Sequence, residues 1–181
     1  MKKLILIALA LIVSFTTIAQ VTKVSSPTSV NPTEFIYEKD EFTDKETLTV
    51  KKGLVISNDG KKGLVLYPVF KKVDGIWTYN GFAGGSNVGT CFENDKIYIL
   101  FEDGTKMDLT SWRKFNCKGD IGFDLYGTMR EKLSQPIKGI KFQNGQDYSS
   151  FEKMLVEQND KNYFVNVFNA LDEYNKTKSS N

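Results

Sequence analysis

The sequence predicts a mainly β fold of the α+β class. We expect a single domain in which an antiparallel sheet, a β-sandwich or a partly open barrel of about eight or nine strands carries one short helix and a C-terminal amphipathic helix packed on it. Short runs of β-branched and aromatic residues alternate with dipeptides that tolerate the positive φ angles of tight hairpin turns. These dipeptides are Asp59-Gly60, Asp74-Gly75, Asn80-Gly81, Asp103-Gly104 and Asn144-Gly145. No helical pattern lies between them, although a parallel sheet would need helical crossovers.

The first 19 residues are typical of a signal peptide. Lys2 and Lys3 precede an apolar run over residues 4–15, and small residues allow cleavage before Gln20. The apolar run is short against the roughly 20 residues that span a bilayer. We therefore expect a periplasmic or secreted protein with no transmembrane segment in the mature chain.

Composition excludes several classes of function. The chain has 181 residues, with 24 Lys and Arg, 22 Asp and Glu, and no histidine. Without imidazole there is no Ser-His-Asp or Cys-His nucleophile system and no His-ligated zinc. Removal of Lys2 and Lys3 with the signal peptide takes the formal charge from +2 to zero, which argues against nucleic acid as a partner. We expect neither a cofactor nor a metal.

The mature chain divides into a leader, a domain and a tail. Residues 20–32 contain two prolines and several Ser and Thr residues, which predicts a flexible leader. Residues 33–175 form the β-rich domain, and residues 176–181 form a polar tail. Within the domain, Pro68 predicts an edge position or a bulge. The expected strands lie at about 34–39, 46–51, 53–57, 63–72, 76–83, 115–125 and 137–142, with a hairpin over 97–109.

The hairpin over residues 97–109 has the clearest pattern. A two-residue turn at Asp103-Gly104 would place Leu100 opposite Met107 and Tyr98 opposite Leu109. One face would then be apolar on both strands, as expected for a sheet that covers a core.

Helical patterns appear only in the last third of the chain. The capping-box spacing that starts at Thr128 predicts a helix of two turns. Residues 161–174 place five apolar side chains on one stripe, behind Asn159 or Asp160 as the N-cap, which predicts an amphipathic helix. Residues 151–157 fit a strand or a helix, and their length favours a strand.

A ligand-binding surface is predicted in the turns and strand of residues 74–90. Trp77 and Tyr79 are two positions apart on an expected strand, so they share one face on which a sugar ring could stack. The glycine-rich stretch 81–90 follows them. The candidate ligand-binding residues are Trp77, Tyr79, Asn80 and Phe82. The alternative is that these aromatic side chains belong to the core, which large aromatic residues commonly fill.

Cys91 and Cys117 are the only cysteines in the chain. In an exported protein an even number of cysteines indicates a disulfide, here with a structural role. Two free buried thiols are one alternative. A redox pair is another, although the close Cys-x-x-Cys spacing of redox pairs is missing.

Four stretches of the second half form a set: Cys91, residues 101–105, residues 114–119 around Cys117, and residues 133–140 before the final amphipathic segment. This set resembles a β-rich family of uncharacterised exported Bacteroidota proteins with a paired-cysteine motif, over residues 90–171. The end of the signal peptide is similar to that of exported proteins from the same bacteria. The resemblance implies a shared fold and a pair of cysteines. The family has no assigned activity, so no functional residue is carried over.

Two functions fit these patterns. The first is an exported, non-enzymatic binding or interaction domain whose ligand is a glycan or a component of the cell envelope, such as an envelope protein. The second is a carboxylate-based glycan hydrolase, which needs only two carboxylates held roughly 5–10 Å apart. The absence of a catalytic motif favours the binding domain, and no catalytic residue is assigned.

Replacing Cys91 and Cys117 together by Ser should lower the melting temperature by several degrees. A crosslink between residues 26 positions apart stabilises a fold by about 3 kcal/mol, because it restricts the unfolded chain. Thermal unfolding followed by circular dichroism measures the loss. Two thiols that react freely with an alkylating reagent in the native protein would contradict the expected disulfide.

Overall fold

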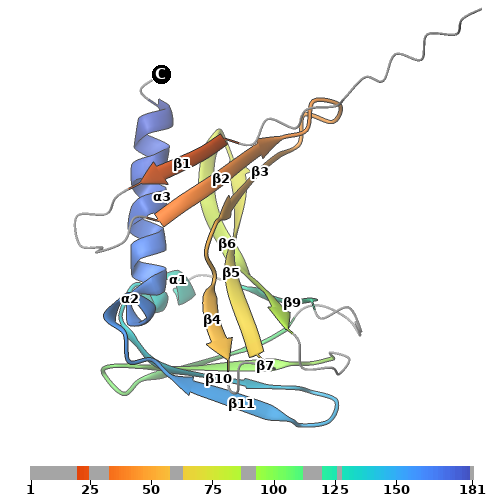
Figure 1. Cartoon of the computed structure of the whole chain (residues 1–181), viewed down its shortest axis with the longest axis vertical. Helices are drawn as coiled ribbons and strands as arrows, with labels where there is room; N and C mark the ends of the chain where they lie inside the picture. The colour runs from red at the N-terminus through yellow and green to blue at the C-terminus, as the bar shows by residue number, and fades with distance from the viewer. Residues whose placement is uncertain are drawn as a thin grey trace, which may run out of the picture.

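Three antiparallel sheets and one long helix make up the described part of the chain (Figure 1). The computed structural model describes residues 20–24, 33–57, 63–86, 93–111, 120–125 and 128–179. Within these ranges the chain is mainly β with a C-terminal helix, so the predicted fold class is confirmed.

Each sheet is built from antiparallel neighbours. The first sheet has the order β1 (Gln20–Val24), β2 (Thr33–Lys39) and β3 (Glu46–Val50). The second has the order β4 (Leu54–Ser57), β5 (Gly63–Val73), β6 (Ile76–Ser86) and β9 (Asp120–Asp124). The third has the order β11 (Ser150–Met154), β10 (Ile137–Gln143), β7 (Lys96–Phe101) and β8 (Lys106–Thr110). The helices are α1 (Met129–Leu133), α2 (Gln158–Lys161) and α3 (Tyr163–Ser179).

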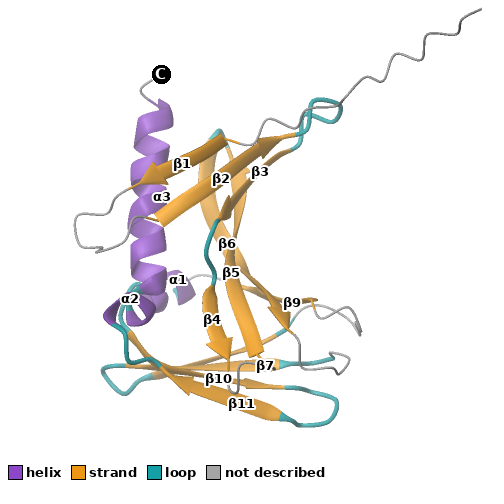
Figure 2. Ribbon diagram, viewed as in Figure 1, coloured by secondary structure: helices purple, strands orange, loops and turns teal. Residues whose placement is uncertain are grey.

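Two hydrophobic clusters form the core. The larger cluster lies between the second and third sheets and includes Phe82, Ile99 and Phe164. The smaller cluster joins the first sheet to the tip of the β5–β6 hairpin and to the later turns of α3, and includes Phe35 and Trp77. Helix α3 and the β5–β6 hairpin contribute to both clusters, and Figure 2 shows both elements running from the third sheet to the first.

The β5–β6 hairpin is distorted where β9 joins it. The register shifts between Val69 and Phe70, which leaves Asn80 as the extra residue of a β-bulge in β6. A Cβ atom on Gly81 would lie 2.2 Å from the carbonyl oxygen of Phe123, so only glycine lets β9 approach this closely. The Asn80-Gly81 pair, which we expected to form a turn, therefore lies inside a strand.

Pro68 lies at the edge of a paired region, which is one of the two positions that the sequence predicts for it. Strand β4 pairs with β5 only as far as Leu66, so β5 has β6 as its single strand partner from residue 67 onward. A residue without an N–H group is tolerated at such an edge.

The β7–β8 hairpin differs by one position from the predicted register. The N–H of Phe101 donates to the carbonyl of Thr105 at 3.0 Å, and Gly104 has φ +83°, so the loop has three residues instead of two. A shift of one position turns a whole strand over. Ile97, Ile99 and Phe101 therefore face the core, whereas Tyr98 and Leu100 lie on the outer face of the sheet.

The helical region begins earlier and ends later than predicted. Glu157 is the N-cap of α2, so Asn159 and Asp160 lie inside a helix instead of capping one. Helix α3 continues to Ser179, into the segment expected to be a polar tail. The predicted short helix corresponds to α1, although the side chain of its N-cap, Thr128, makes no capping hydrogen bond.

Residues 20–24 and residues 150–154 both form strands. Residues 150–154 form β11, as the length of the apolar run predicts. Residues 20–24, which we placed in a flexible leader, form β1 and pair with β2 from Gln20↔Tyr37 to Val24↔Thr33. The alternating pattern of this segment suits a strand, and pairing satisfies its backbone groups.

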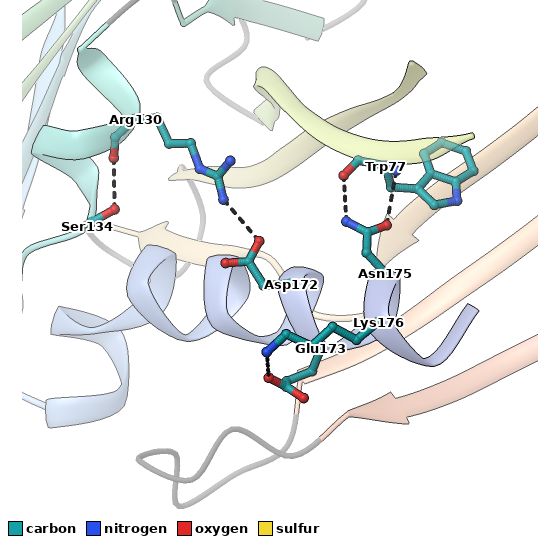
Figure 3. A network of polar contacts seen from close by, with 7 residues as sticks. All are labelled: Trp77, Arg130, Ser134, Asp172, Glu173, Asn175 and Lys176. Atoms are coloured by element: carbon teal, nitrogen blue, oxygen red, sulfur yellow. Dashed lines mark hydrogen bonds and ion pairs between the residues drawn. The ribbon is translucent and has the colours of Figure 1, made fainter. Parts of the chain in front are cut away.

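An asparagine of α3 completes the hydrogen bonding of β6. Strand β9 covers β6 only from Gly81 onward, so none of the described strands lies beside the main chain of Trp77 on that side. The side chain of Asn175 takes this place: its Oδ1 accepts from the Trp77 N–H at 3.0 Å, and its Nδ2 donates to the Trp77 carbonyl at 2.8 Å (Figure 3). Figure 3 also shows Arg130 of α1 reaching Asp172 of α3, at 3.3 Å.

Replacing Asn175 by Ala should lower the free energy of unfolding by about 1–3 kcal/mol, because two partly buried backbone groups of Trp77 lose their partners. Urea denaturation measures the change. Asn169→Ala is the matched control, since Asn169 is exposed on the same helix, and we expect it to change stability by less than about 0.5 kcal/mol. Equal effects of the two substitutions would contradict the pairing.

Candidate functional site

The aromatic residues predicted to bind a ligand lie mainly in the core. Trp77 is 5% exposed and belongs to the smaller cluster, and Phe82 is fully buried in the larger one. Both rings are therefore buried, as in the core alternative, although Trp77 also lines a depression between β3 and β5. Ligand binding by Trp77, Tyr79, Asn80 and Phe82 stays a prediction.

Tyr79 joins the two clusters. Its ring packs edge-on against Phe168 of α3, with ring centroids 4.7 Å apart. Its hydroxyl group is buried and has no hydrogen-bond partner among the described residues. Burial raises the pKa of this hydroxyl well above its usual value. Asn80, the fourth predicted ligand contact, serves the bulge, where its carbonyl accepts the N–H of Leu125 at 3.2 Å.

The predicted disulfide cannot be located in this structure. Cys91 and Cys117 both lie outside the described residues, as does the last part of the glycine-rich stretch, residues 87–90. The pairing of the two cysteines therefore stays a prediction.

The described residues form several surface depressions, and two of them are broad. One, of about 520 Å³, lies over the outer face of the third sheet, where the Tyr98 hydroxyl donates to Gln143 Oε1 at 3.2 Å. The other, of about 700 Å³, lies between β3 and β5, where Lys72 pairs with Glu46 and lies 5.8 Å from the centroid of the Trp77 ring. In each of these two depressions at least one pair of polar side chains is already engaged.

A third depression is narrower and is lined by polar groups. It has a volume of about 310 Å³ and lies between β2, the connection from β3 to β4, and helices α2 and α3. We call it the Asn166 cleft. Its polar lining includes Glu34, Lys51, Lys52, Asp160, Tyr163 and Asn166.

Asn166 is the unusual residue of this cleft. It lies in the second turn of α3 and is only 9% exposed. Its backbone N–H donates to the carbonyl of Asn162 at 2.8 Å, but within the part of the chain that the structure describes nothing hydrogen-bonds its side-chain amide. Because the amide lines the cleft and has no described protein partner, a ligand in the cleft can hydrogen-bond it.

The carboxylates of the cleft are already engaged. Glu34 pairs with Lys51, with Oε2 and Nζ 2.7 Å apart, and Asp160 pairs with Lys153, with Oδ2 and Nζ 3.2 Å apart. A retaining or inverting hydrolase needs one carboxyl group that can act as an acid. In this structure both carboxylates are engaged in ion pairs with lysines.

Tyr163 fixes the connection between β3 and β4 to helix α3. Its hydroxyl donates to the carbonyl of Lys52 at 2.9 Å, and burial raises the pKa of this hydroxyl far above its usual value. Gly53, the next residue, lies so close to β5 that a Cβ atom would be 2.6 Å from Val65 Cγ1 and 2.8 Å from the carbonyl oxygen of Leu66. The rim of the cleft is therefore held by α3 on one side and by β5 on the other.

The other notable carboxyl groups serve loops. Burial raises the pKa of Asp95, whose Oδ1 accepts the N–H of Gly145 at 3.0 Å and so holds the loop after β10. Asp103 accepts hydrogen bonds from the hydroxyl and the N–H of Thr105 in the β7–β8 turn, which lower the pKa of Asp103. Neither lines the Asn166 cleft.

Two further properties bear on function. In the described ranges no three acidic, cysteine or histidine side chains gather as a metal site would require. None of the helices in those ranges has the length and apolarity needed to cross a membrane.

Comparison with protein-family models, with curated proteins and with solved structures found no significant match. The site must therefore be interpreted from its own geometry. Sequence patterns do contain one sign of it, because Asn166 is a polar residue directly beside the apolar stripe of α3 and one turn before the buried Ala170.

Tyr79→Phe should raise the free energy of unfolding by about 1 kcal/mol, because it removes a buried hydroxyl that has no described partner while keeping the ring. Tyr163→Phe is the matched control and should lower stability by about 1 kcal/mol, since it removes the hydrogen bond to Lys52. Urea denaturation compares the two. A loss of stability in the Tyr79 variant would show that its hydroxyl is satisfied.

Proposed function

We propose that this protein is an exported, non-enzymatic binding domain that holds a glycan or another polar component of the cell envelope in the Asn166 cleft. The observation that carries the proposal is the side-chain amide of Asn166, which lines the cleft without a described hydrogen-bond partner although the residue as a whole is only 9% exposed. An amide offers two donors and two acceptor positions, so it can bind adjacent hydroxyl groups or an acetamido group of a sugar.

The size of the cleft suits one such unit. Its volume of about 310 Å³ is at the lower end of the usual range for small-molecule sites, roughly 300–1,000 Å³. A single sugar residue, at the end of a chain or as a branch, fits this space better than an extended oligosaccharide.

A binding role also agrees with the charges around the amide. The two carboxylates that line the cleft pair with lysines, so they stabilise the walls of the site. The sequence supports export through its signal peptide, and a periplasmic or secreted domain encounters envelope glycans.

Asn166→Leu should weaken glycan binding at least about tenfold, because leucine has a similar volume but cannot hydrogen-bond. The mature chain is screened on a glycan array, and its best ligand is then titrated by calorimetry against both proteins. We expect the free energy of unfolding to change by less than about 1 kcal/mol in this variant, since the amide makes no described hydrogen bond within the protein.

Asn169→Leu, on the exposed side of the same helix, is the control and should bind as the original protein does. Unchanged affinity in the Asn166 variant would refute this location of the site. Steady turnover of the bound glycan would refute the non-enzymatic role.

A further inference from the structure

One charged side chain of the Asn166 cleft, that of Lys52, has no described ion-pair partner. Lys51 and Lys52 line the cleft, and Lys153, which lies outside the lining, pairs with Asp160. Only two carboxylates face them, those of Glu34 and Asp160. Each carboxylate pairs with one lysine, and in the described ranges no carboxylate lies within ion-pair distance of the Lys52 ammonium group.

Lys52 is held at the rim by its own backbone. Its carbonyl accepts the Tyr163 hydroxyl at 2.9 Å, and the adjoining Gly53 packs tightly on β5. The base of the side chain is therefore fixed while the ammonium group stays exposed to solvent. Because the backbone of Lys52 is already fixed, less conformational entropy is lost when its ammonium group binds an anion.

We infer that the ligand of the Asn166 cleft is an acidic sugar with a single carboxylate, of the uronic acid class; this inference rests on the proposed function. The carboxylate binds the ammonium group of Lys52, and neighbouring hydroxyl groups bind the amide of Asn166. Both features line the same cleft.

The charge balance selects a carboxylate over a phosphate. One lysine is left without a partner, and a carboxylate supplies one negative charge at neutral pH. A phosphate monoester carries about −1.5 to −2 charges. Its additional charge would lie beside the carboxylates of Glu34 and Asp160, which repel it.

The mature protein is titrated at low salt with three trisaccharides of galactose that differ only in their terminal unit, which is galacturonic acid, neutral galactose or galactose 6-phosphate. We expect the acidic trisaccharide to bind roughly two- to fivefold more tightly than the neutral one, which is the usual strength of one solvent-accessible charge pair. This preference should shrink as salt is added.

Lys52→Gln should remove the preference for the acidic trisaccharide over the neutral one. Lys138→Gln, at an exposed position of β10, is the matched control and should keep the preference. Asn166→Leu should weaken the binding of both the acidic and the neutral trisaccharide.

Three results would overturn the inference: equal binding of the acidic and the neutral trisaccharide, an unchanged preference after Lys52→Gln, or tighter binding of the phosphorylated trisaccharide. If any of these occurs while Asn166→Leu still weakens binding of a glycan, the proposed function stands and only the ligand class fails. If no glycan depends on Asn166, the proposed function fails as well.

Discussion

Helix α3 and the β5–β6 hairpin hold the two hydrophobic clusters together, because each contributes side chains to both. The early turns of α3 bury Phe164 and Phe168 in the larger cluster, and the later turns bury Leu171 and Tyr174 in the smaller one. Without this packing the first sheet would have little apolar surface to cover, since its buried residues face the helix and the hairpin. The first sheet and the third sheet are thus connected mainly through the same two elements.

The candidate site depends on this packing as well. Tyr163 and Asn166 reach the cleft only because the first turns of α3 lie against the end of the first sheet, where β3 leads into β4. Two polar groups near this packing, the Tyr79 hydroxyl and the Asn166 amide, differ in their access to solutes. The Tyr79 hydroxyl lies inside the core, whereas the Asn166 amide lines a cleft that a solute can enter. The Tyr79 hydroxyl has no described partner because its ring packs between the two clusters. A ligand in the cleft can hydrogen-bond the Asn166 amide.

The fold class and the amphipathic helix could be predicted because both depend on local patterns. Turn dipeptides and alternating residues indicate hairpins, and the stripe of apolar residues indicates α3. The register of the β7–β8 hairpin could not be predicted in this way, since loops of two and three residues both accept Asp-Gly. Asn80-Gly81 also resembles a turn, and only the approach of β9 makes it a bulge.

The site was harder to predict than the fold. Trp77 and Tyr79 share features with surface platforms, and their burial depends on the position of α3, which strand periodicity does not reveal. Asn166 and Lys52 are 114 positions apart in the sequence and meet through tertiary packing alone. Neither belongs to a motif, so the pattern that unites them exists only in three dimensions.

The pairing of Asn175 with the main chain of Trp77 has a consequence for the shape of the cleft. Asn166 and Asn175 are nine residues apart, which is about 13 Å along a helix and two and a half turns around it. The hydrogen bonds at Trp77 therefore set the height and rotation of α3 on one side, and with them the position of the Asn166 amide on the other side. These hydrogen bonds hold α3 in one position when a solute enters the cleft. The conformational entropy needed to position Asn166 is therefore lost when the protein folds and not when a ligand binds.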